Sequence, residues 1–130
     1  MDPGKLDKSP LFGSLPDDAK KELAVWISEV EVSPGKHLVD QGDYAYNLFV
    51  IEDGKAEVFQ DGNSVAELGP GDFFGEMGVL EKAQRSATVV SKTRMRLLTL
   101  STWDVKRLNK AAPQVVEQLN AAIEERRGGK

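Results

Sequence analysis

Closely spaced turn residues divide the middle of the chain into short segments, and this spacing limits the folds open to it. Between residues 35 and 71 a glycine recurs every few positions, each time beside proline, aspartate or asparagine. The segments between such turns are short and apolar or alternating, a pattern typical of β-strands. These apolar runs lie at 37–39, 47–51, 55–59, 64–68, 86–91 and 95–100. Because no helical pattern separates them, the sequence predicts an antiparallel sandwich, β-roll or double-stranded jelly roll.

Two of the turns carry the sharpest hairpin signal. Asp53-Gly54 and Asp61-Gly62 are each flanked by apolar runs. An Asp-Gly pair suits the two central positions of a type I′ turn, where the backbone needs a positive φ. We therefore expect a tight hairpin at each of these two places.

Helical periodicity appears on both sides of the β region. Residues 1–15 are predicted to be an irregular lead-in, and Pro16 then stands at a first helical position. After the last strand, Ser101 is a predicted N-cap and Pro113 begins a second C-terminal helix. Trp26 and Trp103, one on each side of the roll, are expected to anchor the core.

The sequence therefore predicts a single domain over residues 1–130 that is mainly antiparallel β with flanking helices. The predicted parts are a lead-in with one N-terminal helix at 1–28, the β-roll at 29–100, and two C-terminal helices at 101–127.

Two residue types on which many functional sites depend are scarce. The chain has no cysteine and one histidine, His37. Disulfides, thiol catalysis and cysteine-ligated metals are therefore excluded, and so is a metal site built on several imidazoles of one chain. We also find no nucleophile–base pair, so we expect no enzymatic activity. No apolar run approaches the roughly 20 residues that span a bilayer, so we expect a cytoplasmic protein without membrane contact.

Charge is distributed unevenly along the chain. The formal net charge is −4, with −9 carried by residues 1–75 and +5 by residues 76–130. An acidic chain has little general affinity for a phosphate backbone, so we expect no nucleic-acid partner. The basic second half still allows a local site for one small anion.

One segment in this second half combines residue types that suit a phosphate. Gly75 and Gly78 flank Glu76 and Met77. The two glycines let a ligand approach the backbone closely. If a short helical turn follows, its unpaired N–H groups converge on one point, where an anion is favoured.

Arg85 stands nine residues after Glu76, at the start of the next apolar run. A guanidinium group can hold a phosphate through two hydrogen bonds, and Ser86 places a hydroxyl beside it. An ionised Glu76 only accepts hydrogen bonds, so it suits a ribose hydroxyl. This pairing fits a small phosphorylated sugar. Taken alone, the same two residues also fit a salt bridge between a turn and a strand.

As one string, the segment resembles the phosphate-binding cassette of cyclic nucleotide-binding domains, found in catabolite-activator-type regulators, cyclic-AMP-dependent kinase regulatory subunits and nucleotide-gated channels. Phe74-Gly75-Glu76-Met77-Gly78 and Arg85-Ser86-Ala87-Thr88-Val89 match the family's pattern in order and spacing. The turn and strand markers also match, so the resemblance covers about residues 9–127.

The resemblance implies a role for each matching residue. Glu76 would accept a hydrogen bond from the ribose 2′-hydroxyl, and Arg85 would pair with the cyclic phosphate. Backbone N–H groups around Gly75, Met77 and Gly78, and that of Ala87, would assist Arg85. Ser86 stands where some relatives place a hydroxyl on the ligand. In the last helix, Leu119 and Ile123 would belong to a lid that covers the base, with a hinge near residues 110–113.

Two positions depart from the family's pattern. Gln84 precedes the arginine, where proline is common, so the turn into the strand is less fixed. Gly78 stands where alanine or serine is common. Neither change removes a contact group.

These features together predict a non-catalytic sensor that binds cyclic AMP rather than cyclic GMP and acts on a separate effector protein. The preference for cyclic AMP rests on Ser86 in place of threonine. The expected state is a monomer or weak homodimer, with no metal or other cofactor. The alternatives are a fragment of a transcription regulator or other multidomain effector, and an interaction module that keeps the fold without binding nucleotide.

Overall fold

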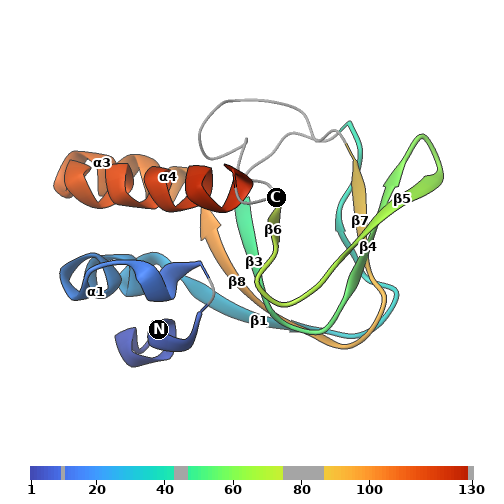
Figure 1. Ribbon diagram of the computed structural model, residues 1–130, viewed down its shortest axis with the longest axis horizontal. Coiled ribbons are helices and arrows are strands. Elements are labelled where there is room, and N and C mark those ends of the chain that lie inside the picture. The colour runs from blue at the N-terminus through green and yellow to red at the C-terminus, as the bar shows by residue number, and fades with distance from the viewer. Residues whose placement is uncertain (10, 43–46, 75–86, 129–130) are drawn as a thin grey trace.

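In the computed structural model, which describes residues 1–130 except 10, 43–46, 75–86 and 129–130, the strands form two four-stranded antiparallel sheets (Figure 1). The strands are β1 (Ser28–Val32), β2 (His37–Val39), β3 (Asn47–Asp53), β4 (Ala56–Gln60), β5 (Asn63–Leu68), β6 (Phe73–Phe74), β7 (Thr88–Ser91) and β8 (Met95–Ser101). Their order is β1-β8-β3-β6 in one sheet and β2-β7-β4-β5 in the other.

The pairing of the strands is nested. β1 pairs with β8, β2 with β7, β3 with β6, and β4 with β5, all antiparallel. The chain is therefore a long hairpin rolled over on itself, which is the arrangement of a jelly roll. This confirms the predicted fold class of an antiparallel β-roll with flanking helices.

The two Asp-Gly turns have different outcomes. Asp61 (φ 53°) and Gly62 (φ 82°) join β4 directly to its partner β5, so the predicted hairpin is confirmed. The hairpin predicted at Asp53-Gly54 is wrong, because β3 and β4 belong to different sheets. There the turn carries the chain from one sheet to the other.

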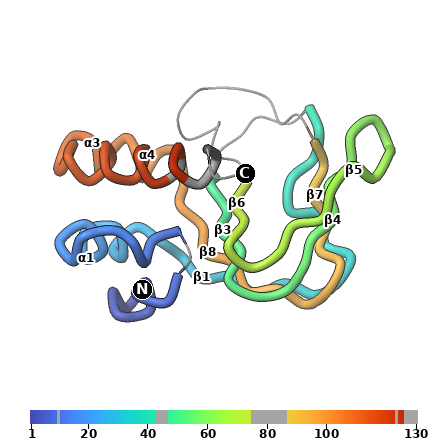
Figure 2. Tube along the Cα trace, in the orientation of Figure 1, coloured from blue at the N-terminus to red at the C-terminus, as the bar shows by residue number. Residues whose placement is uncertain are grey.

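Helices cover the outer face of the sheet that contains β8. They are α1 (Asp17–Trp26), α3 (Thr102–Ala111) and α4 (Pro113–Gly128), and they lie together on one side of the roll (Figure 2). Leu98 and Leu100 of β8 pack into this helical layer, whereas Met95 and Leu97 point into the roll. The alternation along one strand thus separates a helical core from a core between the sheets.

The first fifteen residues differ from the irregular lead-in that was predicted. They contain two short 3₁₀ helices, η1 (Pro3–Lys8) and η2 (Phe12–Ser14). Leu6, Leu11 and Phe12 are at most 1% exposed and belong to the helical core. Such helices are too short to leave a periodic pattern in a sequence, so the sequence did not predict them.

Helix α3 confirms one prediction and contradicts another. The Ser101 hydroxyl accepts a hydrogen bond from the Asp104 N–H at 3.0 Å, so Ser101 is the predicted N-cap. Trp103 does not anchor the core, because it is 64% exposed and the Lys106 ammonium lies 4.8 Å from its ring centroid. Val105 faces the core, and Trp103 stands about 200° away from it around the helix. Trp26 is partly buried against the helical core.

On the face of the sheet that is turned toward the helices, the apolar residues are followed by charged ones. On β3, Leu48 and Val50 are buried in the helical core, and Glu52 is the next residue on that face. Glu52 is half-buried, and its burial raises the pKa of its carboxyl group above the ordinary 4.5. Hydrogen bonding with Ser9 and the charge of Arg96 oppose this rise but do not cancel it.

Glu52→Gln is expected to become more stable relative to the parent as the pH rises. A carboxyl whose pKa is raised on folding stabilises the protein below about pH 4.5, and this contribution disappears as the pH passes the folded-state pKa. Glutamine does not ionise, so the stability of the variant does not fall in this way as the pH rises. Urea unfolding of both proteins from about pH 4 to about pH 7 measures the difference. A difference that stays constant or shrinks with rising pH would contradict the expectation.

Candidate functional site

The predicted cassette lies on the connection between β6 and β7. Gly75, Glu76, Met77, Gly78, Arg85 and Ser86 lie outside the described residues. Ala87 is described, and it forms a half-buried bend directly before β7. Because β6 belongs to one sheet and β7 to the other, the connection that carries the cassette spans the two sheets.

The first end of this connection is fixed by β6 and β3. Phe73 pairs with Val50 and Phe74 with Phe49. The rings of Phe49 and Phe74 are stacked, with centroids 4.9 Å apart and an interplanar angle of 13°. Phe74, the residue just before Gly75, therefore has a fixed place between the sheets.

The second end is fixed by three polar residues from distant parts of the chain. The Thr88 hydroxyl accepts a hydrogen bond from the Gln41 backbone N–H at 2.9 Å. The Gln41 side chain donates to the Asp61 carboxylate and accepts from the Asp61 N–H, both at 2.9 Å. Sequence reasoning missed this network, in which Gln41 holds the first residue of β7 directly after Ala87. In the sequence, Gln41 stands beside Gly42 in one of the turns, and no sequence signal links it to Asp61.

The space between the sheets is lined by apolar side chains that are buried to different degrees. Ile51, Ala56 and Met95 are at most 2% exposed. A second set packs against these residues but is only partly buried: Val32, Leu38, Val39, Phe49, Val58 and Leu68. The roll thus offers partly accessible apolar surface of the kind that a small ligand covers.

The predicted lid helix is α4. Leu119 is fully buried in the helical core, together with Val115, Val116 and Ala122. The side chain of Ile123 lies outside the described part of the structure. Ala112 alone separates α3 from α4, with a non-helical backbone (φ −149°, ψ 72°), inside the hinge region predicted at residues 110–113.

The histidine and the possible metal ligands form no metal site within the described residues. His37 is exposed on β2, and its Nδ1 lies 2.7 Å from the Asp40 carboxylate. No group of three or more histidine, cysteine or acidic side chains in the described ranges is arranged to hold a metal ion. Nor does any helix in those ranges have the length and apolar character needed to cross a membrane.

The fold places the chain among the helix-flanked jelly-roll domains, and comparison with known proteins identifies the family. The family profile for the cyclic nucleotide-binding domain matches residues 29–111, more than half of the chain. The chain therefore belongs to the cyclic nucleotide-binding domain family.

Three relatives show the kinds of protein in which similar domains occur. A cAMP-dependent protein kinase regulatory subunit of Schizosaccharomyces pombe is 35% identical over 104 residues, which cover 79% of this chain and 25% of that protein. A cyclic nucleotide-gated potassium channel of Rhizobium etli is 34% identical over 120 residues, 92% of this chain and 34% of the channel. The crystal structure of the N-terminal domain of a transcriptional regulator from Streptomyces coelicolor is 32% identical, with a TM-score of 0.78, and the match covers 93% of this chain and 90% of that one.

This chain thus spans about a quarter of the kinase subunit and a third of the channel. All three relatives are named as regulatory or gated proteins, so the chain corresponds to their regulatory cyclic nucleotide-binding part.

Proposed function

We propose that this chain is a single sensor domain that binds a 3′,5′-cyclic nucleotide and acts on a separate effector protein, without catalytic activity of its own. The observation that carries the proposal is the string from Phe74 to Val89, with Glu76 and Arg85 nine residues apart, in a chain that belongs to the cyclic nucleotide-binding domain family. The fixed ends of that string on β6 and β7 support it.

The proposed chemistry divides the ligand between two side chains. Arg85 holds the cyclic phosphate through charge-assisted hydrogen bonds, aided by backbone N–H groups from Gly75 to Gly78 and at Ala87. Glu76 accepts a hydrogen bond from the ribose 2′-hydroxyl. Ser86 adds a hydroxyl next to the arginine. The partly buried apolar residues between the sheets, such as Phe49, provide a surface against which the remainder of the ligand packs.

The resemblance to the family implies a lid motion of the last helix about a hinge at Ala112, but the burial of α4 limits the part that can move. Leu119 is already buried among the helices, so it holds the middle of α4 in place. Ala122 is buried there as well, so the part of α4 that we propose to close over a base is the part after Ala122, which begins at Ile123. Closure of this part would carry the binding signal to the effector protein.

Cyclic AMP is the proposed ligand in preference to cyclic GMP. Ser86 occupies the position where threonine would favour the guanine nucleotide. Among the relatives, the Schizosaccharomyces pombe protein is named as a cAMP-dependent regulatory subunit. Both points bear on the ligand, and the ratio of the two measured affinities decides between the nucleotides.

Arg85→Ala is expected to weaken cyclic nucleotide binding by about 30- to 150-fold, since a hydrogen bond to a charged group contributes roughly 2–3 kcal/mol. Calorimetric titration with cyclic AMP and cyclic GMP measures this. Arg94→Ala is the matched control, because the Arg94 side chain is 78% exposed and pairs with Glu31 at 3.1 Å. If neither nucleotide gives heat or raises the melting temperature at millimolar concentration, the sensor proposal is wrong. The remaining alternative would then be an interaction module that keeps the fold without binding a nucleotide.

A second candidate is the sensor part of a larger regulator, with its effector in the same polypeptide. It is favoured by the 32% identity to the N-terminal domain of a transcriptional regulator. It is also favoured because the chain covers only 25% of the kinase subunit and 34% of the channel. The natural reading frame on both sides of residues 1–130 distinguishes the two candidates. For the separate domain we propose a cytoplasmic monomer or weak homodimer that contacts neither nucleic acid nor membrane, and sedimentation measures its oligomeric state.

A further inference from the structure

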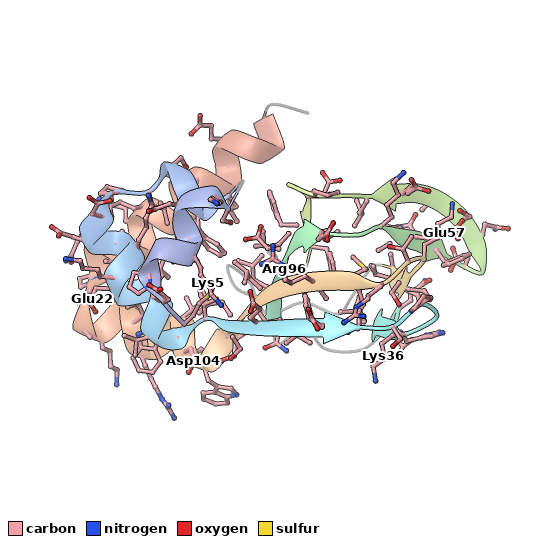
Figure 3. The ribbon with its side chains drawn as sticks, turned by 90° about the horizontal axis from the view of Figure 1, so that it is seen from below. Lys5, Glu22, Lys36, Glu57, Arg96 and Asp104 are labelled. Carbon is pink, nitrogen blue, oxygen red and sulfur yellow. The ribbon has the colours of Figure 1, made fainter. Side chains whose placement is uncertain are left out.

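A cavity of about 560 Å³ lies where the N-terminal segment meets the roll. Figure 3 shows this junction between the helical layer and the sheets, with Lys5 and Arg96 on its two sides. The lining comes from η1 and the residues before it, and from β1, β3 and β8. The lining residues among those that the structure describes lie outside the proposed nucleotide cassette, and the volume of the cavity is within the range of small-molecule sites. The charged lining residues are Asp2, Lys5, Lys8, Glu29, Glu52 and Arg96.

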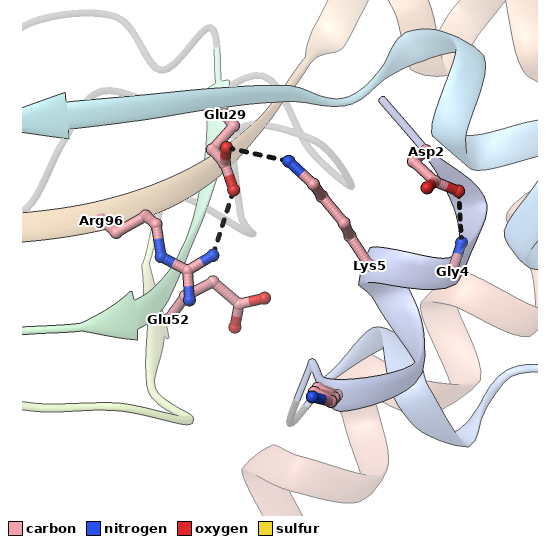
Figure 4. Close-up of a pocket in the computed structure, with 7 residues that line it drawn as sticks. Asp2, Gly4, Lys5, Glu29, Glu52 and Arg96 are labelled. Atoms are coloured by element: carbon pink, nitrogen blue, oxygen red, sulfur yellow. Dashed lines mark hydrogen bonds and ion pairs between the residues drawn. The ribbon is translucent and has the colours of Figure 1, made fainter.

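Part of this lining is already paired (Figure 4). The Glu29 carboxylate accepts a hydrogen bond from Arg96 Nη1 at 3.0 Å, and the Lys5 ammonium lies 3.6 Å from its other oxygen. The hydrogen bond from Arg96 is the main reason that the pKa of Glu29 is lowered. Asp2 accepts from the Gly4 N–H at 2.9 Å. Glu29 is thus paired with two cations, and Asp2 is bonded to a backbone N–H, without any ligand.

Two oppositely charged residues of the same lining, Glu52 and Lys8, form no ion pair within the described part of the chain. Oε2 of Glu52 is buried and has no hydrogen-bond partner. The Glu52 side chain points into the space between Arg96 and η1 (Figure 4). Within the described residues, the Lys8 ammonium has neither an ion pair nor a hydrogen bond. A buried acceptor without a partner is costly, so a donor at this place would stabilise the protein.

We propose that this cavity binds a small zwitterion of the α-amino acid type, with its ammonium group on Glu52 and its carboxylate on Lys8. A simple anion would leave Glu52 Oε2 unpaired. A simple cation would leave Lys8 unmatched and would meet the positive charges of Lys5 and Arg96. The lining carries three cations and three carboxylates, which favours a ligand without net charge.

Such a ligand would connect two layers of the molecule. Lys8 belongs to η1 and Glu52 to β3, and both line the cavity. A zwitterion bound to both ties the N-terminal segment to the roll. Because the unfolded chain lacks this arrangement, binding also raises the melting temperature.

The test is a titration of the full chain, without cyclic nucleotide, with an equimolar mixture of the twenty standard amino acids and then with each one alone. Amide shifts in ¹H–¹⁵N spectra are expected to saturate and to be largest around Lys8, Glu52 and Arg96. Glu52→Gln and Lys8→Ala are each expected to weaken binding about tenfold or more. The matched controls Glu57→Gln and Lys36→Ala, on the far side of the roll in Figure 3, should leave it unchanged. Thermal unfolding shows whether each variant is folded.

The blocked forms of the amino acid that binds complete the experiment. Acetylation removes the ammonium group and esterification removes the carboxylate, so both forms should bind at least about tenfold more weakly. The proposal is wrong if no saturable shift appears by about 10 mM amino acid, or if the shifts lie elsewhere in the chain. It is equally wrong if folded Glu52→Gln and Lys8→Ala bind as the parent does, or if either blocked form binds as tightly as the free amino acid.

Discussion

Gly54→Ala is expected to lower the free energy of unfolding by about 3–5 kcal/mol. Gly54 has a φ of 89°, a conformation that a residue with a side chain rarely adopts. A Cβ atom at this position would also collide with the carbonyl oxygen of Arg94 and would lie 2.9 Å from the Cα of Met95. Both obstacles are backbone atoms, so no side-chain rotation relieves them.

The surrounding hydrogen bonds explain why the backbone cannot move aside easily. The Lys55 N–H donates to the Thr93 hydroxyl at 3.0 Å, and the Lys55 carbonyl accepts from the Lys92 N–H at 2.9 Å. The turn between β3 and β4 is thereby held against the turn between β7 and β8. Moving Gly54 away from Arg94 would break these contacts.

Gly35→Ala is the matched control for this prediction. Gly35 has a nearly equal φ of 85°, but no atom lies within 4 Å of a Cβ placed on it. It should therefore lose only the conformational part, about 1 kcal/mol. Urea unfolding of the two variants beside the parent gives the difference. Equal losses would mean that the approach to Arg94 does not matter and that the positive φ alone determines the effect.

The same glycine shows what a local pattern can and cannot predict. An Asp-Gly pair favours a turn with a positive φ, and the chain does bend at Gly54 with a φ of 89°. Which strands pair across a turn depends on the whole roll, so the expected β3–β4 hairpin was wrong. At Asp61-Gly62 the strands on either side, β4 and β5, do pair, so there the Asp-Gly signal predicted the hairpin correctly. Each of the six apolar runs overlaps a strand, so these positions were predictable from the turns between them, whereas the two-residue β6 was not. The assignment of strands to sheets depends on the wider fold.

The helices show a similar limit. The burial of Val115, Val116, Leu119 and Ala122 agrees with their spacing along one side of α4. Trp103 was assigned to the core on its size and apolar character, although the helical period turns it away from Val105. For a large residue at a helix N-terminus, the direction of the side chain was more informative than its hydrophobicity.

The candidate sites also differ in how far the sequence alone can predict them. The cassette from Phe74 to Val89 is contiguous, so its order and spacing are visible in the sequence. The Gln41 network and the charged cavity are assembled from distant segments. Lys8 and Glu52, for example, are separated by more than forty residues in the sequence but line the same cavity in the fold. Only the folded chain shows such sites.

The position of Leu119 leads to a second large expected effect, on stability more than on ligand binding. The resemblance to the family places Leu119 in a lid over the base, but its side chain is fully buried between α4 and the other helices. A side chain that covers a ligand-binding site is partly exposed when the ligand is absent. Leu119 therefore contributes to the helical core, and the two roles can be separated by measurement.

Leu119→Ala is expected to lower the free energy of unfolding by about 3–5 kcal/mol, because it removes buried methyl groups and leaves a cavity. Glu117→Ala, on the exposed side of the same helix, should change it by no more than about 0.5 kcal/mol. Thermal or urea unfolding measures both, and calorimetry with cyclic AMP on the folded fraction measures binding. If Leu119→Ala keeps the parent's stability and loses nucleotide affinity instead, Leu119 acts as a lid residue. A loss of stability with little change in affinity means that Leu119 fixes the middle of α4, which leaves the part of α4 around Ile123 to close over the base.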